Sequence, residues 1–348
     1  MSKKYKLAVV IGRRQISHKG HELLTKHALE IAERVLLIFG SAFKCRDPSN
    51  PFTWQERAEM ATSILTNDEL RRTICLPSRD YYNDEKWVDD IKGMVRCFER
   101  VPNNIVLVGH KKSGDNDTYY LDNFSEWALD CIESNVNTSS TILREQYFNA
   151  IKTKLVGVLD QMVRDGNISA PVSDFLKQWS RIHSQEYREI AIYHKMLSNK
   201  EVILDNRPNN IRYQLLGVIT RSDHILLEKR IGYCDGSFGI PSTPIIEHES
   251  CINTVITMLN YGLGINVSRD TWLKYYNGVK IYDHPKRSAI GRVIALVHNF
   301  DFSNVNIPMN LSDESKPIFV HANKLRSIED QIFEDNFIIA AEILDLHL

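Results

Sequence analysis

The stretch from Val9 to His21, VVIGRRQISHKGH, limits the fold of this chain more than any other part of the sequence. An apolar run from Leu7 to Ile11 reads as a buried strand, and it ends at Gly12. After a short loop, a helical pattern begins at Gly20 and continues as HELLTKHALEIAERV. A buried strand that gives way at once to a helix is typical of a parallel α/β unit. We therefore expect an α/β fold with an open parallel sheet.

Two histidines, His18 and His21, lie where this strand gives way to the helix. In open α/β sheets, ligands bind at the carboxyl ends of the strands. A helix start also offers unpaired N–H groups and the positive end of the helix dipole, which suit phosphate. With Arg13, Arg14 and Lys19 nearby, the pattern predicts a cradle for a polyphosphate. The alternative is one surface and one core histidine, because such a spacing often arises by chance.

The HxGH pair resembles the signature of nucleotidyltransferases, and the wider pattern GRxQxxHxGH resembles nicotinamide mononucleotide (NMN) adenylyltransferases of the archaeal and bifunctional type. Arg14 stands where that family usually has Phe, and Ile16 where it usually has Pro; both changes alter the shape of the loop. The resemblance implies that the two histidines bind the ATP phosphates and act in catalysis. The other ATP contacts that it implies in this stretch are Gly12, Arg13 and Gly20.

The segment NPFTWQER contains a second informative pattern. Thr53 and Glu56 form a capping box, which predicts a helix start. Arg57 then lies in the first turn, where the helix dipole disfavours a cation, and this indicates an anionic partner. The alternative is a surface arginine paired with Glu56 or Glu59. The segment resembles the NPFT-x-x-ER motif of the same family, which implies that Arg57 holds the phosphate of NMN.

The segment DYYNDEKW resembles the DYxYNDxxW motif of that family, in which Trp stacks on the nicotinamide ring and Asn bonds its carboxamide. Trp87 and Asn83 are the matching residues. A pyridinium ring over an indole face gains on the order of 1–2 kcal/mol. Packing alone is the alternative for Trp87. The complete set of NMN contacts that the resemblance implies is Ser41, Asn50, Arg57, Asp80, Asn83 and Trp87.

Two further segments point to ATP. GHKK follows a fourth apolar strand, which would place His110 and Lys112 on the ligand side of the sheet. NTSSTILREQYF matches the S-x-T-x-x-R pattern that closes over ATP in this superfamily, with Ser139, Thr141 and Arg144. Hydroxyls at a helix start and one arginine suit a triphosphate. The alternatives are a solvated basic turn and ordinary helix caps.

The second half of the chain opens with a predicted hairpin over 211–230, turning at Ser222 and Asp223, which resembles the start of a Nudix domain. The catalytic helix of Nudix hydrolases would lie between Thr243 and Ile265, and Glu249 fits its scaffold. The reactive positions, which should carry an arginine and glutamates, are Thr257, Met258, Tyr261 and Gly262. Magnesium requires hard oxygen ligands. We therefore expect a Nudix fold that has lost its hydrolase site.

Three alternatives remain open for function. The first domain could transfer a nucleotide to another phosphate acceptor. The second could be a working pyrophosphohydrolase for ADP-ribose or NAD, in which Glu228 or Asp283 replaces the missing acids. It could also be a nucleotide sensor or a dimerisation surface. The segment 279–292 resembles a DHPxRSxRGR motif of the family, which leaves room for an ADP-ribose-like ligand.

The whole chain has 348 residues, and this length favours about two domains. We expect a Rossmann-like nucleotidyltransferase domain at 1–180, a helical connector at 181–206 and a Nudix-like α/β/α domain with a mixed sheet at 207–348. The formal net charge of −1 argues against nucleic acid as the main partner. No apolar run approaches a membrane span of about 20 residues.

The expected reaction joins ATP and NMN to give NAD and diphosphate, in NAD biosynthesis or salvage. Nicotinate mononucleotide is an alternative acceptor, and Mg²⁺ would accompany ATP. No residues of the sequence can be assigned as metal ligands. The six cysteines are scattered with no CxxC pair, and no signal peptide is evident, so we expect a cytoplasmic protein with reduced thiols. The chain could form a homo-oligomer.

Overall fold

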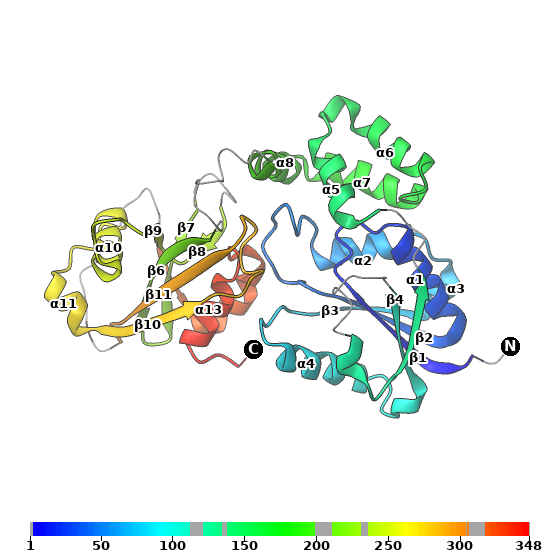
Figure 1. Cartoon of the computed structure of the whole chain (residues 1–348), viewed down its shortest axis with the longest axis horizontal. Helices are drawn as coiled ribbons and strands as arrows, with labels where there is room; N and C mark the ends of the chain where they lie inside the picture. Colours follow the sequence, from blue (N-terminus) through cyan, green and yellow to red (C-terminus); the bar gives the residue numbers. More distant parts are fainter. Residues whose placement is uncertain are drawn as a thin grey trace. The chain divides into compact units, whose positions relative to one another are not determined.

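A computed structural model describes residues 3–111, 121–133, 138–198, 211–230, 236–303, 305 and 317–347. Its contacts divide the chain into two compact units (Figure 1). Unit 1 comprises Met1–Phe43 and Pro48–His194, and unit 2 comprises Lys44–Asp47 and Lys195–Leu348. The expected domain limits, with a connector at 181–206, stay a prediction, because residues 199–210 lie outside the described part.

Unit 1 is built on a five-stranded sheet in which every pairing is parallel, in the order β3-β2-β1-β4-β5. The strands are β1 (Tyr5–Gly12), β2 (Ala32–Phe39), β3 (Thr73–Pro77), β4 (Ile105–Lys111) and β5 (Ala128–Glu133). The strand order reverses between β1 and β4, which makes their carboxyl ends the expected ligand side. The predicted parallel sheet is confirmed.

Helices cover both faces of this sheet (Figure 1). Successive residues of a strand point to opposite faces. Ala8 and Val10 pack with α1 and α2, whereas Leu7 and Val9 pack with α4. The helices of unit 1 are α1 (Lys19–Ile31), α2 (Trp54–Thr62), α3 (Asn67–Arg71), α4 (Asp84–Arg96), α5 (Ser140–Asn149), α6 (Leu155–Arg164), α7 (Ala170–Ile182) and α8 (Ser184–Ser198).

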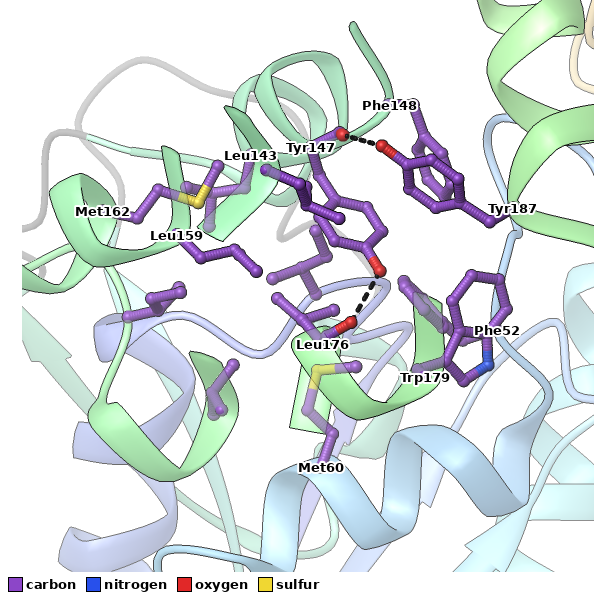
Figure 2. Close-up of a cluster of buried hydrophobic side chains, with 14 of the residues drawn as sticks. Phe52, Met60, Leu143, Tyr147, Phe148, Leu159, Met162, Leu176, Trp179 and Tyr187 are labelled. Carbon is purple, nitrogen blue, oxygen red and sulfur yellow. Dashed lines mark hydrogen bonds between the residues drawn. The ribbon is translucent and has the colours of Figure 1, made fainter. Parts of the chain in front are cut away.

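A separate apolar cluster joins α5–α8 to the loop that precedes α2 (Figure 2). The Tyr147 hydroxyl donates to the carbonyl of Leu176 at 2.8 Å, and the Tyr187 hydroxyl donates to the carbonyl of Tyr147 at 2.9 Å. Phe52 meets Trp179 edge-on, with ring centroids 4.8 Å apart. Burial of large aromatic side chains is strongly stabilising. The cluster therefore holds the buried face of α5, with Leu143, Tyr147 and Phe148, against the loop before α2.

Unit 2 is built on a mixed sheet in the order β10-β11-β6-β7-β12, with β8 paired to β7 and β9 paired to β6. The pair β6–β11 is parallel and the other pairs are antiparallel. The predicted hairpin is confirmed as β6 (Arg212–Arg221) and β7 (His224–Lys229). The remaining strands are β8 (Phe238–Gly239), β9 (Ser242–Pro244), β10 (Tyr276–Tyr282), β11 (Val293–Asp301) and β12 (Ile318–His321).

The sheet of unit 2 also lies between two helical layers, which confirms the expected α/β/α sandwich. On one face, α10 (Cys251–Thr257) runs into a π-helical turn (Met258–Gly262), followed by α11 (Arg269–Lys274). α12 (Ala322–Leu325) and α13 (Asn336–Ile343) pack on the other face. Gly217 on β6 allows α10 to approach closely, since a Cβ there would lie 2.9 Å from Val255 Cγ1.

Among the described residues, no helix has both the length and the apolar character needed to cross a membrane.

Candidate functional site

The two histidines form the start of α1 at the carboxyl end of β1. His18 is the N-cap, and its Nδ1 accepts the N–H of Gly20 at 3.1 Å. The Nδ1 of His21 accepts the N–H of His18 at 3.3 Å, so both histidines form a reciprocal capping box. Because each Nδ1 is an acceptor, each neutral ring carries its proton on Nε2. The cap thus gives both side chains a hydrogen-bond donor at the same ring position.

Gly20 lies between two imidazole rings, those of His18 at the start of α1 and His110 at the end of β4. The Nε2 of His110, at the end of β4, bonds the carbonyl of Gly20 at 3.0 Å. A Cβ at Gly20 would lie 3.0 Å from His18 Cε1 and 3.2 Å from His110 Nε2. Only a residue without a side chain fits there without moving a ring. The structure therefore places His110 beside the HxGH turn, and its contact with ATP stays a prediction. Lys112 lies outside the described residues.

The start of α5 is bonded directly to the loop before His18. Ser140 Oγ donates to the carbonyl of Ile16 at 2.9 Å, which brings the two nucleotide motifs together. Ser139 is the N-cap of α5 and accepts the N–H of Ile142 at 3.3 Å. The largely buried Arg144 donates to Thr141 Oγ1 at 3.1 Å. The sequence prediction assigned no role to Ser140, although it lies inside the S-x-T-x-x-R motif.

Arg57 is fully buried, and its guanidinium lies among backbone carbonyls. It donates to the carbonyls of Arg13 at 2.5 Å, Gly40 at 2.8 Å and Ser41 at 3.3 Å. Burial lowers its pKa to about 9, and the charge of Asp80 opposes this shift. The alternative of a surface arginine paired with Glu56 or Glu59 is wrong. Arg57 holds the ends of β1 and β2 together at the ligand side of the sheet.

Gln15 is a site residue that the sequence prediction missed. Its amide nitrogen donates to Asn50 Oδ1 and to the carbonyl of Phe52, and its Oε1 accepts the N–H of Phe52 at 3.1 Å. These bonds attach the NPFT segment to the HxGH loop. The signal was present in the sequence, because Gln15 is the glutamine of the GRxQ pattern.

Two of the predicted phosphate contacts, Gly12 and Arg13, lie at the end of β1. The Arg13 side chain is exposed, and its carbonyl is one of the four that accept from Arg57. A Cβ at Gly12 would meet only Arg14 Cγ, at an ordinary contact distance of 3.8 Å. The structure therefore gives no steric reason for glycine at position 12.

The predicted acceptor residues gather at the ends of β2 and β3. Ser41 Oγ donates to Asp80 Oδ2 at 2.7 Å. Asn83 is the N-cap of α4, and its Oδ1 accepts the N–H of Lys86 at 2.9 Å. Trp87, in the first turn of α4, is half-buried and meets Phe124 edge-on, with centroids 5.8 Å apart. Trp87 thus packs on the core while part of its indole is exposed.

Unit 2 lacks the acidic constellation of a Nudix site in its described part. Glu249 accepts from Thr254 Oγ1 at 3.0 Å and Thr257 Oγ1 at 3.4 Å. Tyr261, at the position of a catalytic glutamate, is 87% exposed. Among the described residues, no three His, Cys, Asp or Glu side chains gather closely enough to hold a metal.

In unit 2, a buried ion pair joins the segment between β10 and β11 to the start of α13. Arg287 and Asp335 form two hydrogen bonds, of 2.8 and 2.9 Å, and both side chains are almost fully buried. Beside them, burial raises the pKa of Glu334 to about 7, while hydrogen bonds from Ser288 and the N–H of Ala289 oppose the shift. Glu334 also has a φ of +49°, a left-handed conformation that is rare outside glycine.

The parallel sheet, its ligand side and the HxGH turn define a nucleotide-binding α/β fold of the nucleotidyltransferase class. No family model matches the chain. The chain is 34% identical over 146 residues to the nicotinamide/nicotinic acid mononucleotide adenylyltransferase of Acinetobacter baylyi, and the match covers 42% of this chain and 77% of that protein. This chain belongs to the same family of mononucleotide adenylyltransferases.

Archaeal relatives match a smaller part of this chain. The nicotinamide-nucleotide adenylyltransferase of Methanolobus tindarius is 36% identical over 101 residues, which cover 29% of this chain and 58% of that protein. A solved structure from Francisella tularensis, a bifunctional NMN adenylyltransferase/ADP ribose pyrophosphatase complexed with AMP and a manganese ion, covers 98% of this chain and 99% of its own. Its TM-score is 0.83 and its identity is 24%, which confirms the fold of both units.

Proposed function

We propose that unit 1 transfers the adenylyl group of ATP to NMN, giving NAD and diphosphate, with nicotinate mononucleotide as a second acceptor. One observation carries the proposal: the HxGH turn holds both histidines at the carboxyl end of β1 through Nδ1, and the start of α5 is bonded to the same loop. Membership of the adenylyltransferase family supports this reaction. The proposed setting is NAD biosynthesis or salvage in the cytoplasm.

In the proposed mechanism, an oxygen of the NMN phosphate attacks the α-phosphorus of ATP in line. The bond from the α-phosphorus to the bridging oxygen breaks, and diphosphate leaves without a covalent intermediate. The enzyme contributes positioning and stabilisation of charge. His18 and His21 donate through Nε2 to oxygens of the α-phosphoryl group. Arg144 is the third catalytic residue and neutralises the departing phosphates. The further proposed ATP contacts are Gly12, Arg13, Gly20, His110, Lys112, Ser139 and Thr141.

On the acceptor side, Trp87 would stack on the pyridinium ring, and Asn83 would bond its carboxamide. The cap bond occupies one lone pair of Asn83 Oδ1, whereas the Nδ2 group of this exposed side chain remains a donor for the acceptor's carbonyl oxygen. Arg57 would act on the NMN phosphate from the strand ends where its charge lies. Ser41, Asn50 and Asp80 complete the proposed acceptor site.

Magnesium would enter with ATP. The described residues offer no cluster of metal ligands, which fits an ion held mainly by substrate phosphates and water. When bound, Mg²⁺ would offset the negative charge of the phosphates.

For unit 2 we propose a hydrolase-inactive Nudix fold that retains room for an ADP-ribose-like ligand. The absent glutamates and the 87% exposed Tyr261 support this proposal. Of the substitute acids, Glu228 has a pKa raised by burial, and Asp283 accepts from Arg292 through its carbonyl. Neither belongs to a metal-binding group of described residues.

A product assay tests both proposals on the purified full chain. ATP and Mg²⁺ are supplied with NMN, with nicotinate mononucleotide or with another phosphate acceptor, and ADP-ribose is supplied alone. We expect NAD from NMN and no loss of ADP-ribose. No NAD, with ATP still bound, would overturn the acceptor assignment. Loss of ADP-ribose that depends on Glu249 would overturn the proposal for unit 2.

A further inference from the structure

Arg14 is a buried cation behind the HxGH turn, at a position where the resembling family usually has Phe. Its side chain is 3% exposed, and its φ is +49°. Its terminal nitrogen NH1 donates to Thr25 Oγ1 at 3.0 Å. The hydroxyl of the fully buried Thr25 in turn donates to the carbonyl of His21 at 2.9 Å. A continuous hydrogen-bond chain therefore leads from the guanidinium to a proposed catalytic residue.

The charge of Arg14 has no counter-ion among the described residues. Its other terminal nitrogen, NH2, is buried and lacks a hydrogen-bond partner there. The Cys75 thiol acts on the charge of Arg14, but burial raises the pKa of this thiol to about 11, so it is neutral at physiological pH. An unpaired buried charge and a left-handed arginine are each unfavourable for folding. Such costs are typical of sites where the conformation or the charge serves a ligand.

We propose that Arg14 is a positioning residue of the ATP site. Through Thr25 it fixes the carbonyl of His21 and so orients the first turn of α1, on which both imidazoles depend. Its uncompensated charge lies behind that turn, in a low-dielectric interior where its field is weakly screened, and favours a polyphosphate in front of it. This inference rests on the proposed function, because it takes His21 as a contact of the ATP phosphates.

The test removes the charge and the bridge separately. Arg14→Met keeps a long apolar side chain without the charge, and Thr25→Val replaces the hydroxyl by a methyl group of equal size. We expect each to raise the KM for ATP about tenfold and to leave the KM for NMN unchanged, the scale of one lost charge-assisted hydrogen bond. The double variant should be little worse than the worse single one, since both residues belong to one chain of bonds.

Direct binding separates charge from shape. Titration calorimetry with ATP and with adenosine should show that Arg14→Met weakens ATP about tenfold and leaves adenosine unaffected, because only the phosphates respond to the field. Arg14→Lys should keep part of the ATP affinity. Arg72→Met is the matched control: Arg72 also donates to buried backbone carbonyls, those of Leu29 and Ala32, at the far end of α1.

The outcomes are distinct. Unchanged ATP affinity in both Arg14→Met and Thr25→Val, or equal losses for ATP and adenosine, would overturn the inference. A lower melting temperature with unchanged KM for ATP would reduce Arg14 to a structural role. Should Arg14→Met fail to fold, Thr25→Val still decides the matter. Failure of the wild-type chain to make NAD would count against the proposed function, whereas ATP binding by the same variants would still test the inference.

Discussion

The imidazole rings of His18 and His21 stack face to face, with centroids 3.8 Å apart and planes inclined by 28°. Each ring accepts a backbone N–H of the same turn through Nδ1. The helix cap and the proposed catalytic pair are therefore one structure. Any change that disturbs the turn must alter both rings together.

Replacing His21 by Ala should lower turnover at least about 100-fold, because one preorganised donor to the reacting phosphoryl group is lost. Steady-state NAD formation measures this. His27→Ala is the control on the same helix, where His27 pairs with Asp130 at 3.3 Å. If His21→Ala stays within a few-fold of the wild type, the role given to His21 is wrong.

Gly20→Ala tests the spacing of the rings. The added Cβ would press on His18 and His110, so we expect a loss of activity of at least about tenfold in a folded protein, on the scale of a misplaced catalytic group. Gly157→Ala in α6 is the control, since nothing lies within 4 Å of its Cβ position. That control should be about 0.5–1 kcal/mol more stable than the wild type. Equal activity of the two variants would contradict the steric argument.

Arg57→Lys keeps the charge but loses the planar fork. An ammonium group cannot reach all the carbonyls that the guanidinium of Arg57 joins, so the free energy of unfolding should fall by about 2–3 kcal/mol. Denaturant unfolding measures this fall. The same variant should raise the KM for NMN if the charge at the strand ends also serves the phosphate. A rise in that KM with unchanged stability would show that the carbonyl bonds matter little.

Glu334 gives the stability of unit 2 a pH dependence. Its pKa rises from 4.5 to about 7 on folding, so the folded state holds the proton more tightly than the unfolded state. The stabilisation is complete below pH 4.5 and is lost as the pH rises through 7, by about 2 kcal/mol after allowance for partial exposure. Glu334→Gln should abolish this decline and be the more stable protein at pH 8. Parallel pH profiles for the two proteins would contradict the prediction.

Sequence patterns alone predicted most elements of this fold. The apolar runs predicted β1 and β4, and Thr53 with Glu56 formed the capping box that was expected. The edge strand β5 was not predicted, because most of its side chains are partly exposed and its apolar signal is weak. Helix α3, with five residues and none buried, was missed for the same reason.

The candidate site shows a similar division. The motifs identified the candidate residues, and the parallel sheet predicted that these residues lie at the ends of strands. Gln15, Ser140 and Thr25 were assigned no role, since each acts by bonding a backbone group that is distant in sequence or in a neighbouring turn. The surface alternative for Arg57 was wrong, because its side chain is buried among backbone carbonyls, whereas its contact with the NMN phosphate stays a prediction.

Residue types and their spacing were enough to predict phosphate chemistry, because the imidazole, guanidinium and hydroxyl groups of the motifs can be read directly from the chain. The sequence also determined that Thr257, Met258 and Tyr261 cannot supply carboxylates. Folding alone created the hydrogen bonds in which Nδ1 of His18 and Nδ1 of His21 accept backbone N–H groups, and it set what the buried Arg14 and Arg57 contact. The reason is physical: tautomers and buried charges are set by hydrogen-bond partners that only folding brings within reach.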